Sequence, residues 1–260
     1  MGNGRWGMLK AKRSVLLMLF AICHMPCTSW AYVPGKFYYQ GRTKEKVIAL
    51  TFDDGPGNFT PPILDFLKER QIHATFFMEG SQVEEYPQIA RQVHEAGHEI
   101  GNHTYIHFDF HKQKNAAPQR LAHELEQTES ALRRALHDPD FKTKLVRMPY
   151  GYFNKTWLLP TLKEHDYALV HWTFGEDWLT KRPAGKNAPS EWVTLTPEVL
   201  AADYIKNARP GAVFLFHDGG RRRERTFAAL KIVIDALEKE GYKFVTAEEM
   251  FSASAPIPAP

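Results

Sequence analysis

The stretch VIALTFDDGPG, Val47 to Gly57, joins an apolar run to two adjacent aspartates and a Gly-Pro pair. The apolar half has the length and composition of a buried strand. The second half is typical of a surface turn, which would need no function. Two like charges at the end of a buried strand are costly, however, unless an opposite charge lies beside them. Whether Asp53 and Asp54 form a turn or a site therefore depends on where the other reactive residues fall.

Residues 1–31 have the features of a secretory signal. Four basic residues precede the apolar run SVLLMLFAIC, and the small-x-small pattern TSWA ends at Ala31. The run is short for a bilayer, which favours cleavage over an uncleaved membrane anchor. Cleavage would remove both cysteines and four basic residues but no acidic ones, so the formal net charge would change from +3 to −1. We expect a secreted or cell-envelope protein without disulfides, with no stable membrane insertion and no nucleic-acid partner.

Seven short apolar or β-rich runs alternate with six segments of helical periodicity. The runs cover residues 47–51, 74–78, 98–102, 144–147, 168–173, 212–216 and 243–246. The helical segments cover residues 61–70, 86–96, 118–136, 156–165, 196–207 and 226–240. This alternation predicts parallel strands with helical crossovers, in an open doubly wound sheet or in a closed, irregular (β/α) barrel. No Gly-x-Gly-x-x-Gly follows the first run, which removes the usual dinucleotide reason for an open sheet.

The length of the chain allows a single large domain, and no interior linker divides it. We assign residues 47–251 to this domain and residues 32–46 to an N-terminal extension. The final stretch SASAPIPAP, residues 252–260, is low in complexity and is expected to be a disordered tail. One longer irregular segment, residues 180–193, is long enough to be a functional loop.

Residues able to do chemistry follow the carboxyl ends of strand after strand. They are Asp53 and Asp54, His103 and His107, Arg147, Asp177 and Trp178, and His217 and Asp218. In a parallel barrel these strand ends form one face, and active sites are built on that face. The convergence favours a site over a simple turn.

The spacing of His103 and His107 can place two imidazoles on one side of a helical turn, which suits a single metal ion. The alternative is a pair of surface histidines. One aspartate added to the pair gives two histidines and a carboxylate, a set that leaves coordination positions open for water and substrate. Neighbouring side chains point in different directions, so Asp53 and Asp54 can divide the roles of metal ligand and general base. The metal's charge would also remove their mutual repulsion.

Five motifs resemble those of the polysaccharide deacetylase family, the NodB-homology group also called carbohydrate esterase family four. They are TFDDGP at 51–56, HTYIH at 103–107, RMPYG at 147–151, DW at 177–178 and LFHD at 215–218. Their order and spacing carry the resemblance, which covers roughly residues 47–251. The resemblance implies a distorted (β/α) barrel with seven or eight parallel strands.

The resemblance also implies one divalent metal, usually zinc, with cobalt, nickel or iron as substitutes. Its ligands would be Asp54, His103 and His107. By the same resemblance Asp53 is the general base that takes a proton from the attacking water, and His217 is the acid that protonates the departing amine.

Further roles carried over from the family concern residues around these groups. The backbone N–H of Tyr150 would stabilise the oxyanion, and Arg147 would pair with the base aspartate. Asp177 would orient the catalytic histidine. Leu215 and Trp178 would wall a pocket for the acetyl methyl group. The simpler alternatives are core packing for Leu215 and Trp178 and a surface ion pair for Arg147.

Two positions depart from the family pattern. Glu176 precedes Asp177 and could compete for the role of orienting the histidine. Phe108 follows His107 where relatives often have proline. Neither departure removes a ligand or an acid–base group, so we expect an active enzyme.

The function implied is removal of N-acetyl groups from N-acetylglucosamine-type residues of peptidoglycan, chitin oligomers or an exopolysaccharide, by a monomer. O-deacetylation, for example of acetylated xylan, is an alternative, because the motifs do not distinguish an amine from an alkoxide leaving group. A glycan-binding module without activity is another, with Trp172, Trp178 and Trp192 stacking on sugar rings. Asp53 and His217 argue against it, because binding alone needs neither an acid nor a base.

Overall fold

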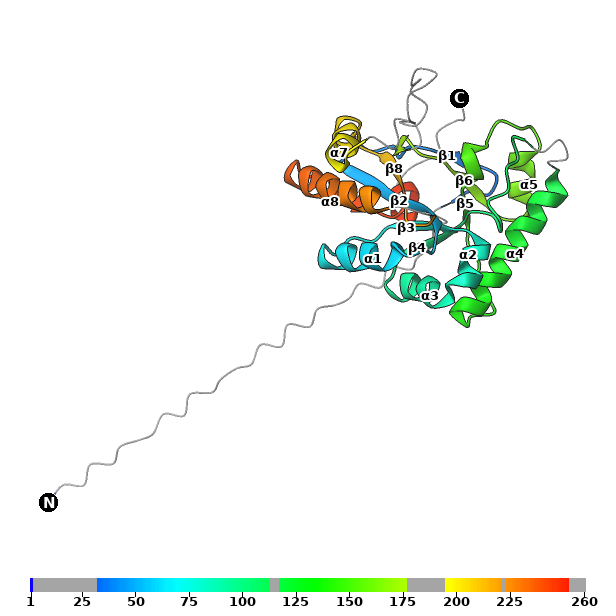
Figure 1. The fold of residues 1–260 in the computed structure, drawn as a ribbon, viewed down its shortest axis with the longest axis horizontal. Helices are drawn as coiled ribbons and strands as arrows, with labels where there is room; N and C mark the ends of the chain where they lie inside the picture. Colours follow the sequence, from blue (N-terminus) through cyan, green and yellow to red (C-terminus); the bar gives the residue numbers. More distant parts are fainter. Residues whose placement is uncertain (2–31, 113–116, 177–194, 221–222, 253–260) are drawn as a thin grey trace.

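The structure is a computed structural model that describes residues 1, 32–112, 117–176, 195–220 and 223–252. Its elements follow one another along the chain and are labelled in Figure 1 where there is room. They are β1 (Phe37–Tyr38), β2 (Val47–Gly55), α1 (Thr60–Glu69), β3 (Thr75–Met78), α2 (Gly80–Glu85), α3 (Pro87–Glu95), β4 (Glu99–Asn102), α4 (Pro118–Leu136), β5 (Leu145–Val146), the 3₁₀ turn η1 (Pro149–Gly151), α5 (Leu158–Glu164), β6 (Ala168–Val170), β7 (Phe174–Gly175), α7 (Pro197–Lys206), β8 (Ala212–His217), α8 (Glu224–Lys239), β9 (Lys243–Val245) and α9 (Ala247–Ser252).

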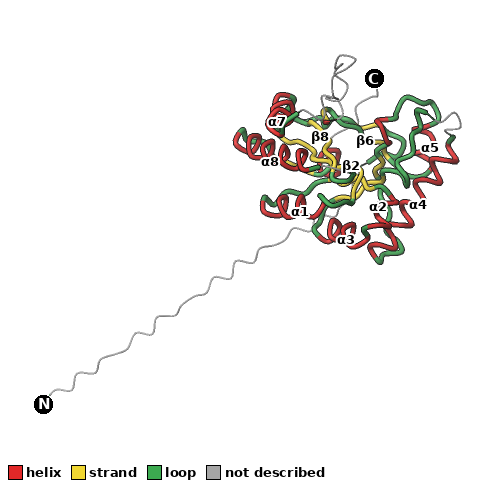
Figure 2. The backbone as a smooth tube through the Cα atoms, viewed as in Figure 1, coloured by secondary structure: helices red, strands yellow, loops and turns green. Residues whose placement is uncertain are grey.

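The strands form one nine-stranded sheet in which every pairing is parallel. Its order is β1-β6-β5-β4-β3-β2-β8-β7, and β9 also pairs with β2. Figure 2 shows the strands gathered in the interior with helices around them. The expected distorted (β/α) barrel in a single domain is therefore confirmed.

One short segment connects strands that lie near opposite ends of this sheet. β6 pairs with β5 and β1, while β7 pairs with β8 at the other end, although only residues 171–173 separate β6 from β7. In this connection the Thr173 N–H donates to the Val213 carbonyl at 2.9 Å. The single strand predicted over residues 168–173 is therefore wrong in detail, because the chain bends there from β6, which lies beside the edge strand β1, to β7 at the opposite edge of the sheet.

The segment before β2 contributes to the barrel. β1, within residues 32–46, pairs with β6, and the buried Tyr32 places its ring 6.3 Å from that of Tyr38. The Tyr32 hydroxyl donates a hydrogen bond to Glu99 at the start of β4. The stretch expected to be an extension thus covers the end of the barrel where the strands begin.

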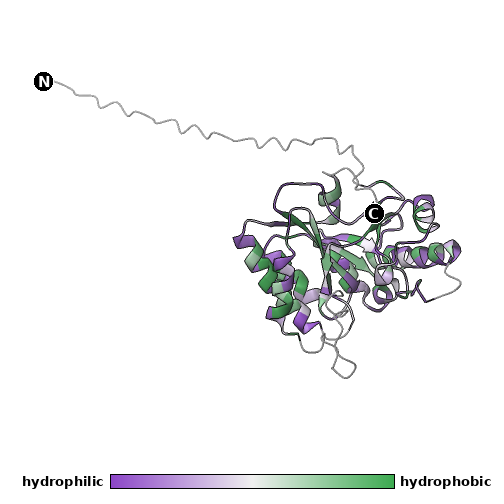
Figure 3. Ribbon diagram, turned by 90° about the horizontal axis from the view of Figure 1, so that it is seen from above, coloured by the Kyte–Doolittle hydropathy of each residue, from purple (hydrophilic) through white to green (hydrophobic). Residues whose placement is uncertain are grey.

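Alternation along the strands divides the core into two main parts. Phe52 and Phe216 pack toward the flanking helices, whereas Phe77 and Leu215 belong to the cluster inside the barrel. In Figure 3 the hydrophobic colour runs along the strands and along one side of the flanking helices. Parallel strands covered on both faces explain why their sequences read as continuous apolar runs. Within the described ranges, no helix combines the length and hydropathy that a bilayer span requires.

Candidate active site

Asp53 and Asp54 lie near the end of β2, where the strand is irregular. A regular strand would send the two side chains to opposite faces. Asp54 instead has a φ of 70°, and the register between β2 and β3 shifts between Asp53 and Gly55. As a result His103 Nε2 lies 3.8 Å from Asp53 Oδ2 and 3.4 Å from Asp54 Oδ1. The bulge therefore brings both carboxylates to one site.

His103 and His107 lie in the loop that follows β4. The helical turn expected for this pair is wrong, because Thr104 and His107 have φ angles of 66° and 51° and no helix forms. The loop nevertheless brings the two rings to a centroid distance of 5.0 Å, and His107 Nε2 lies 3.3 Å from Asp54 Oδ1. One ligand atom from each of Asp54, His103 and His107 falls within a span of 4.8 Å.

The chemistry of these three groups fits a divalent cation. Asp54 Oδ1 is buried and has no hydrogen-bond partner among the described residues. Burial opposes ionisation of Asp54, yet the positive charge of His217 and the contacts with His103 and His107 hold its pKa well below the usual range. His103 Nδ1 lies 2.7 Å from the Arg147 carbonyl, so Nδ1 donates there and Nε2 is left as the ligand atom. Burial also lowers the pKa of His107 to about 4, which keeps this imidazole neutral at pH 7.

Arg147 follows β5 and is completely buried. Its Nη1 donates to Asp53 Oδ1 at 2.7 Å and to Thr51 Oγ1 at 2.8 Å, and the guanidinium lies 4.1 Å from the centre of the Phe77 ring. The alternative of a surface ion pair is therefore wrong. The pairing fixes Asp53 and leaves its second oxygen, Oδ2, on the side of His103.

His217 ends β8 and is held by Glu176, which follows β7. Its Nδ1 lies 2.7 Å from Glu176 Oε1, and its Nε2 lies 3.8 Å from Asp54 Oδ2. Glu176 is buried, and Thr226 donates to its other oxygen at 2.8 Å. Burial opposes ionisation of Glu176, but the hydrogen bond with His217 and the charges of His217 and Arg223 lower its pKa. Glu176 thus takes the histidine-orienting position that the sequence assigned first to its neighbour, while Asp177 and Trp178 lie outside the described residues.

Tyr150 and Leu215 flank the site in different ways. Tyr150 sits in η1 with a φ of 58°, is 57% exposed, and places its ring 4.6 Å from that of His107. Leu215 is fully buried in the cluster inside the barrel, together with Trp172. Core packing, the simpler alternative, therefore describes Leu215.

Two further residues near the site were not given roles from the sequence. Arg223 places Nη2 3.3 Å from Asp54 Oδ2 and Nη1 3.6 Å from Glu176 Oε1. Asp218 is buried, accepts a 2.5 Å hydrogen bond from Thr60, and has its pKa raised by burial to about 7. No feature of the sequence distinguishes Arg223 from the other arginines in the run GGRRRER.

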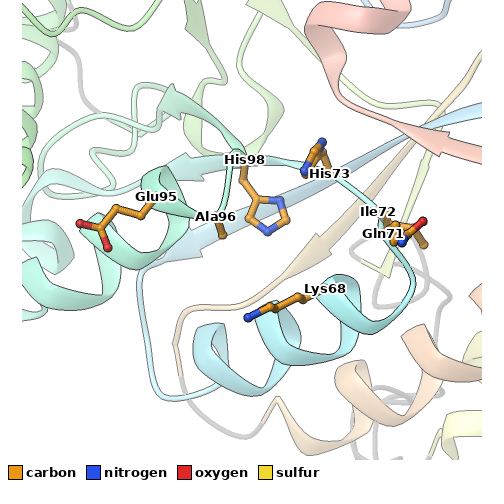
Figure 4. Close-up of a pocket in the computed structure, with 7 residues that line it drawn as sticks. All are labelled: Lys68, Gln71, Ile72, His73, Glu95, Ala96 and His98. Atoms are coloured by element: carbon orange, nitrogen blue, oxygen red, sulfur yellow. The ribbon is translucent and has the colours of Figure 1, made fainter. Parts of the chain in front are cut away.

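A separate cavity of about 390 Å³ lies at the opposite end of the strands (Figure 4). Its lining comprises Lys68, Gln71, Ile72, His73, Glu95, Ala96 and His98. These residues precede β3 and β4 or lie in the helices that lead to them, whereas the aspartates and His103 lie at the strands' carboxyl ends. Its polar groups therefore belong to neither the metal ligands nor the acid–base pair.

Comparison with known proteins agrees with this geometry. Residues 40–177 match the polysaccharide deacetylase family over more than half of the chain. The chain therefore belongs to the polysaccharide deacetylase family, as its motifs predicted.

Individual relatives and solved structures show which kinds of enzyme the chain is similar to. A peptidoglycan-N-acetylglucosamine deacetylase of Bacillus cereus is 36% identical over 207 residues, which make up 79% of this chain and 88% of that protein. A chitooligosaccharide deacetylase of a Bradyrhizobium species is 30% identical over 208 residues, 75% of this chain and 86% of that protein. Among solved structures, a peptidoglycan N-acetylglucosamine deacetylase in complex with an N-oxidanyl-benzamide compound has a TM-score of 0.71 and 29% identity, covering 86% of this chain and 95% of that one.

Proposed function

We propose that the chain is a secreted, metal-dependent hydrolase that removes N-acetyl groups from N-acetylglucosamine-type residues of a polysaccharide. The observation that carries this proposal is the convergence of Asp54, His103 and His107 within 4.8 Å, beside an aspartate held by a buried arginine. The relatives support the glycan class, because one acts on peptidoglycan and another on chitooligosaccharides, as their names state.

The cation expected at the three ligands is divalent and most simply zinc, because a pair of imidazoles with one carboxylate is a common zinc set. When bound, it would supply Lewis-acid stabilisation for the acyl oxygen and lower the pKa of water at the site. Asp54, His103 and His107 would hold it. Cobalt, nickel and iron suit the same donor atoms.

The acid–base steps belong to residues on two neighbouring strands. Asp53 Oδ2 would take a proton from the attacking water, while Arg147 holds Oδ1 and keeps the carboxylate in place. His217 would then give a proton to the departing amine, with its ring fixed through Nδ1 by Glu176. The backbone N–H of Tyr150 would donate to the oxyanion. Trp178 keeps the role in the acetyl pocket that the family resemblance gives it, whereas the orienting role that the resemblance gave Asp177 falls to Glu176.

The proposal also includes export after removal of residues 1–31, a role of the mature chain at the cell envelope, and a monomeric state. The signal features at the N-terminus support export, and action on peptidoglycan by one relative supports the location. In the same proposal the domain extends from residue 32, because β1 pairs with β6, to residue 251, and the tail starts at residue 252.

The test is acetate release by purified Tyr32 to Pro260 from peptidoglycan fragments, chitooligosaccharides and acetylxylan. We expect acetate from at least one N-acetylated glycan, loss of activity with a chelator, and recovery with zinc or cobalt. Release from acetylxylan alone would identify an O-deacetylase. No release from any substrate by metal-loaded protein would favour the binding module.

Asp53→Asn provides the matched variant for this assay. It should retain the metal, because Asp54, His103 and His107 are unchanged, yet lose about two to four orders of magnitude in turnover, the usual contribution of a positioned base. Metal content is measured on the same sample. Normal turnover by Asp53→Asn would show that the base has been assigned to the wrong residue.

A further inference from the structure

The loop that carries both histidine ligands has a costly backbone. Thr104 and His107 both have positive φ angles, 66° and 51°, in the left-handed region that residues other than glycine seldom adopt. Such a conformation is unfavourable and persists only where its surroundings fix the chain. Something must therefore hold residues 103–107 in this conformation.

A buried carboxylate from α4 contacts the middle of this loop. Glu124 has no exposed surface, and its Oε2 accepts hydrogen bonds from the N–H groups of Tyr105, at 2.9 Å, and Ile106, at 3.0 Å. Its other oxygen, Oε1, pairs with Arg120 one turn earlier on the helix. Successive N–H groups that point to one centre form a binding site for an anion, and here the anion is supplied by the chain itself.

The other contacts of the loop backbone use neutral groups, although the Tyr105 side chain also donates its hydroxyl to Glu84 Oε2 at 2.7 Å. Asn102 Oδ1 accepts from the Thr104 N–H at 2.9 Å. The carbonyls of Thr104 and Tyr105 accept from the N–H groups of Gly80 and Ser81 at the start of α2. Hydrogen bonds to a carboxylate are about twice as strong as neutral ones, so Glu124 makes the strongest contacts with the backbone between the two ligands.

We propose that Glu124 is a positioning residue for the metal site, whose carboxylate fixes residues 103–107 so that both imidazoles meet Asp54. Glu124 touches neither the proposed metal nor substrate, and it acts through the backbone between the ligands. The effect of Glu124 on turnover rests on the proposed function. Its effect on metal affinity requires only that Asp54, His103 and His107 are the ligands.

The decisive comparison is Glu124→Ala against Glu126→Ala. Glu126 lies on the same helix and also pairs with an arginine, Arg133, but its side chain is 69% exposed. Zinc affinity is measured by competition with a chromophoric chelator, and amide exchange is followed over residues 103–107 in the metal-free protein. We expect Glu124→Ala to weaken zinc binding about 10–100-fold, as is usual when the support of a ligand is lost. Exchange in the loop should accelerate, and Glu126→Ala should match the wild type in both measurements.

Glu124→Gln covers the case in which the alanine variant does not fold. Its amide oxygen can still accept from both N–H groups without the charge, so we expect a zinc affinity about threefold or more below wild type, and above that of any folded Glu124→Ala. Wild-type zinc affinity and loop exchange in either folded variant would overturn the proposal. Tight zinc binding by a wild-type chain that releases no acetate would instead contradict the proposed function and leave this inference standing.

Discussion

At the scale of single residues, His217 is the acid on which the proposed reaction depends, and two carboxylates face it. Glu176 contacts Nδ1 at 2.7 Å, while Asp54 lies 3.8 Å from Nε2. If Asp54 holds a cation, Glu176 becomes the partner that stabilises a charged imidazole. The charge of Glu176, and not only its position, should then determine how the activity depends on pH.

Glu176→Gln tests this role. The glutamine oxygen can still accept from Nδ1, so the ring should keep its orientation, but the neutral amide no longer stabilises the protonated ring. Activity falls where the acid loses its proton, so the falling limb of the pH–rate profile should move to lower pH, with turnover at neutral pH reduced about 10–100-fold. The control is Glu238→Gln, which removes a surface partner of Arg70. An unshifted limb in Glu176→Gln would exclude this role.

The sequence could indicate that a carboxylate would orient His217, but not which one. Glu176 and Asp177 are adjacent, and the contact that the structure shows, between Glu176 and His217, depends on how β7 and β8 pack together. The place of Arg223 in the site could not be predicted from the sequence for a related reason. Its contact with Asp54 joins residues 169 positions apart, through a loop whose basic composition is typical of an exposed turn.

At the scale of elements, β4 begins with Glu99, a half-buried carboxyl group that directly follows the buried His98. Burial raises the pKa of Glu99 to about 7, and its oxygens accept from Tyr32 and from Thr75. Burial lowers the pKa of the preceding His98 to about 4. The two pKa shifts change the free energy of unfolding in opposite directions as the pH rises. The folded chain holds a proton on Glu99 that the unfolded chain releases, and it excludes from His98 a proton that the unfolded chain binds.

Glu99→Gln isolates one of these effects. A raised carboxyl pKa means that the stabilisation is complete below about pH 4.5 and is lost as the pH rises through 7, by at most about 3 kcal/mol. Glu99→Gln lacks this loss while His98 is unchanged. The free energy of unfolding of the variant minus that of wild type should therefore increase between pH 5 and pH 8, as measured by denaturant titration. A difference that does not change with pH would contradict the prediction.

Elements of regular pattern could be predicted, whereas some of the shortest elements could not. The helix over residues 118–136 is found at the same bounds as α4, because its apolar face repeats with helical period over five turns. α2, with six residues, and β1 and β7, with two each, lack the length to show a period. Tertiary contacts decide them, as when the chain bends after β6 to pair with β8.

At the scale of the whole molecule, the fold depends on a segment that precedes the family motifs. Tyr32, Phe37 and Tyr38 are each at most 7% exposed, and they lie against β6 and the interior cluster or its neighbours. Alternating strands and helices predicted the barrel from residue 47 onward. They gave no reason to include residues 32–46, whose two-residue strand has too little pattern to detect.

A chain that starts at Val47 should therefore be much less stable than one that starts at Tyr32. Each buried aromatic side chain contributes about 1.5–3 kcal/mol, and domains of this kind have only about 5–15 kcal/mol in total. The urea midpoint of residues 47–260 should fall steeply, or the transition should disappear. Truncation after Ser252 serves as the control and should leave the midpoint nearly unchanged. Equal midpoints for 32–260 and 47–260 would show that the early segment is dispensable.

β2 is hydrogen-bonded along both edges, by β8 on one side and by β3 and β9 on the other. The strand that presents both aspartates is thus among the hardest parts of this protein to displace. During evolution, the loops around such a site can change so that they bind another sugar polymer. The direction from which the nucleophile approaches stays the same, because the central strand does not move. Diversity in what is recognised then coexists with a single way of breaking the bond.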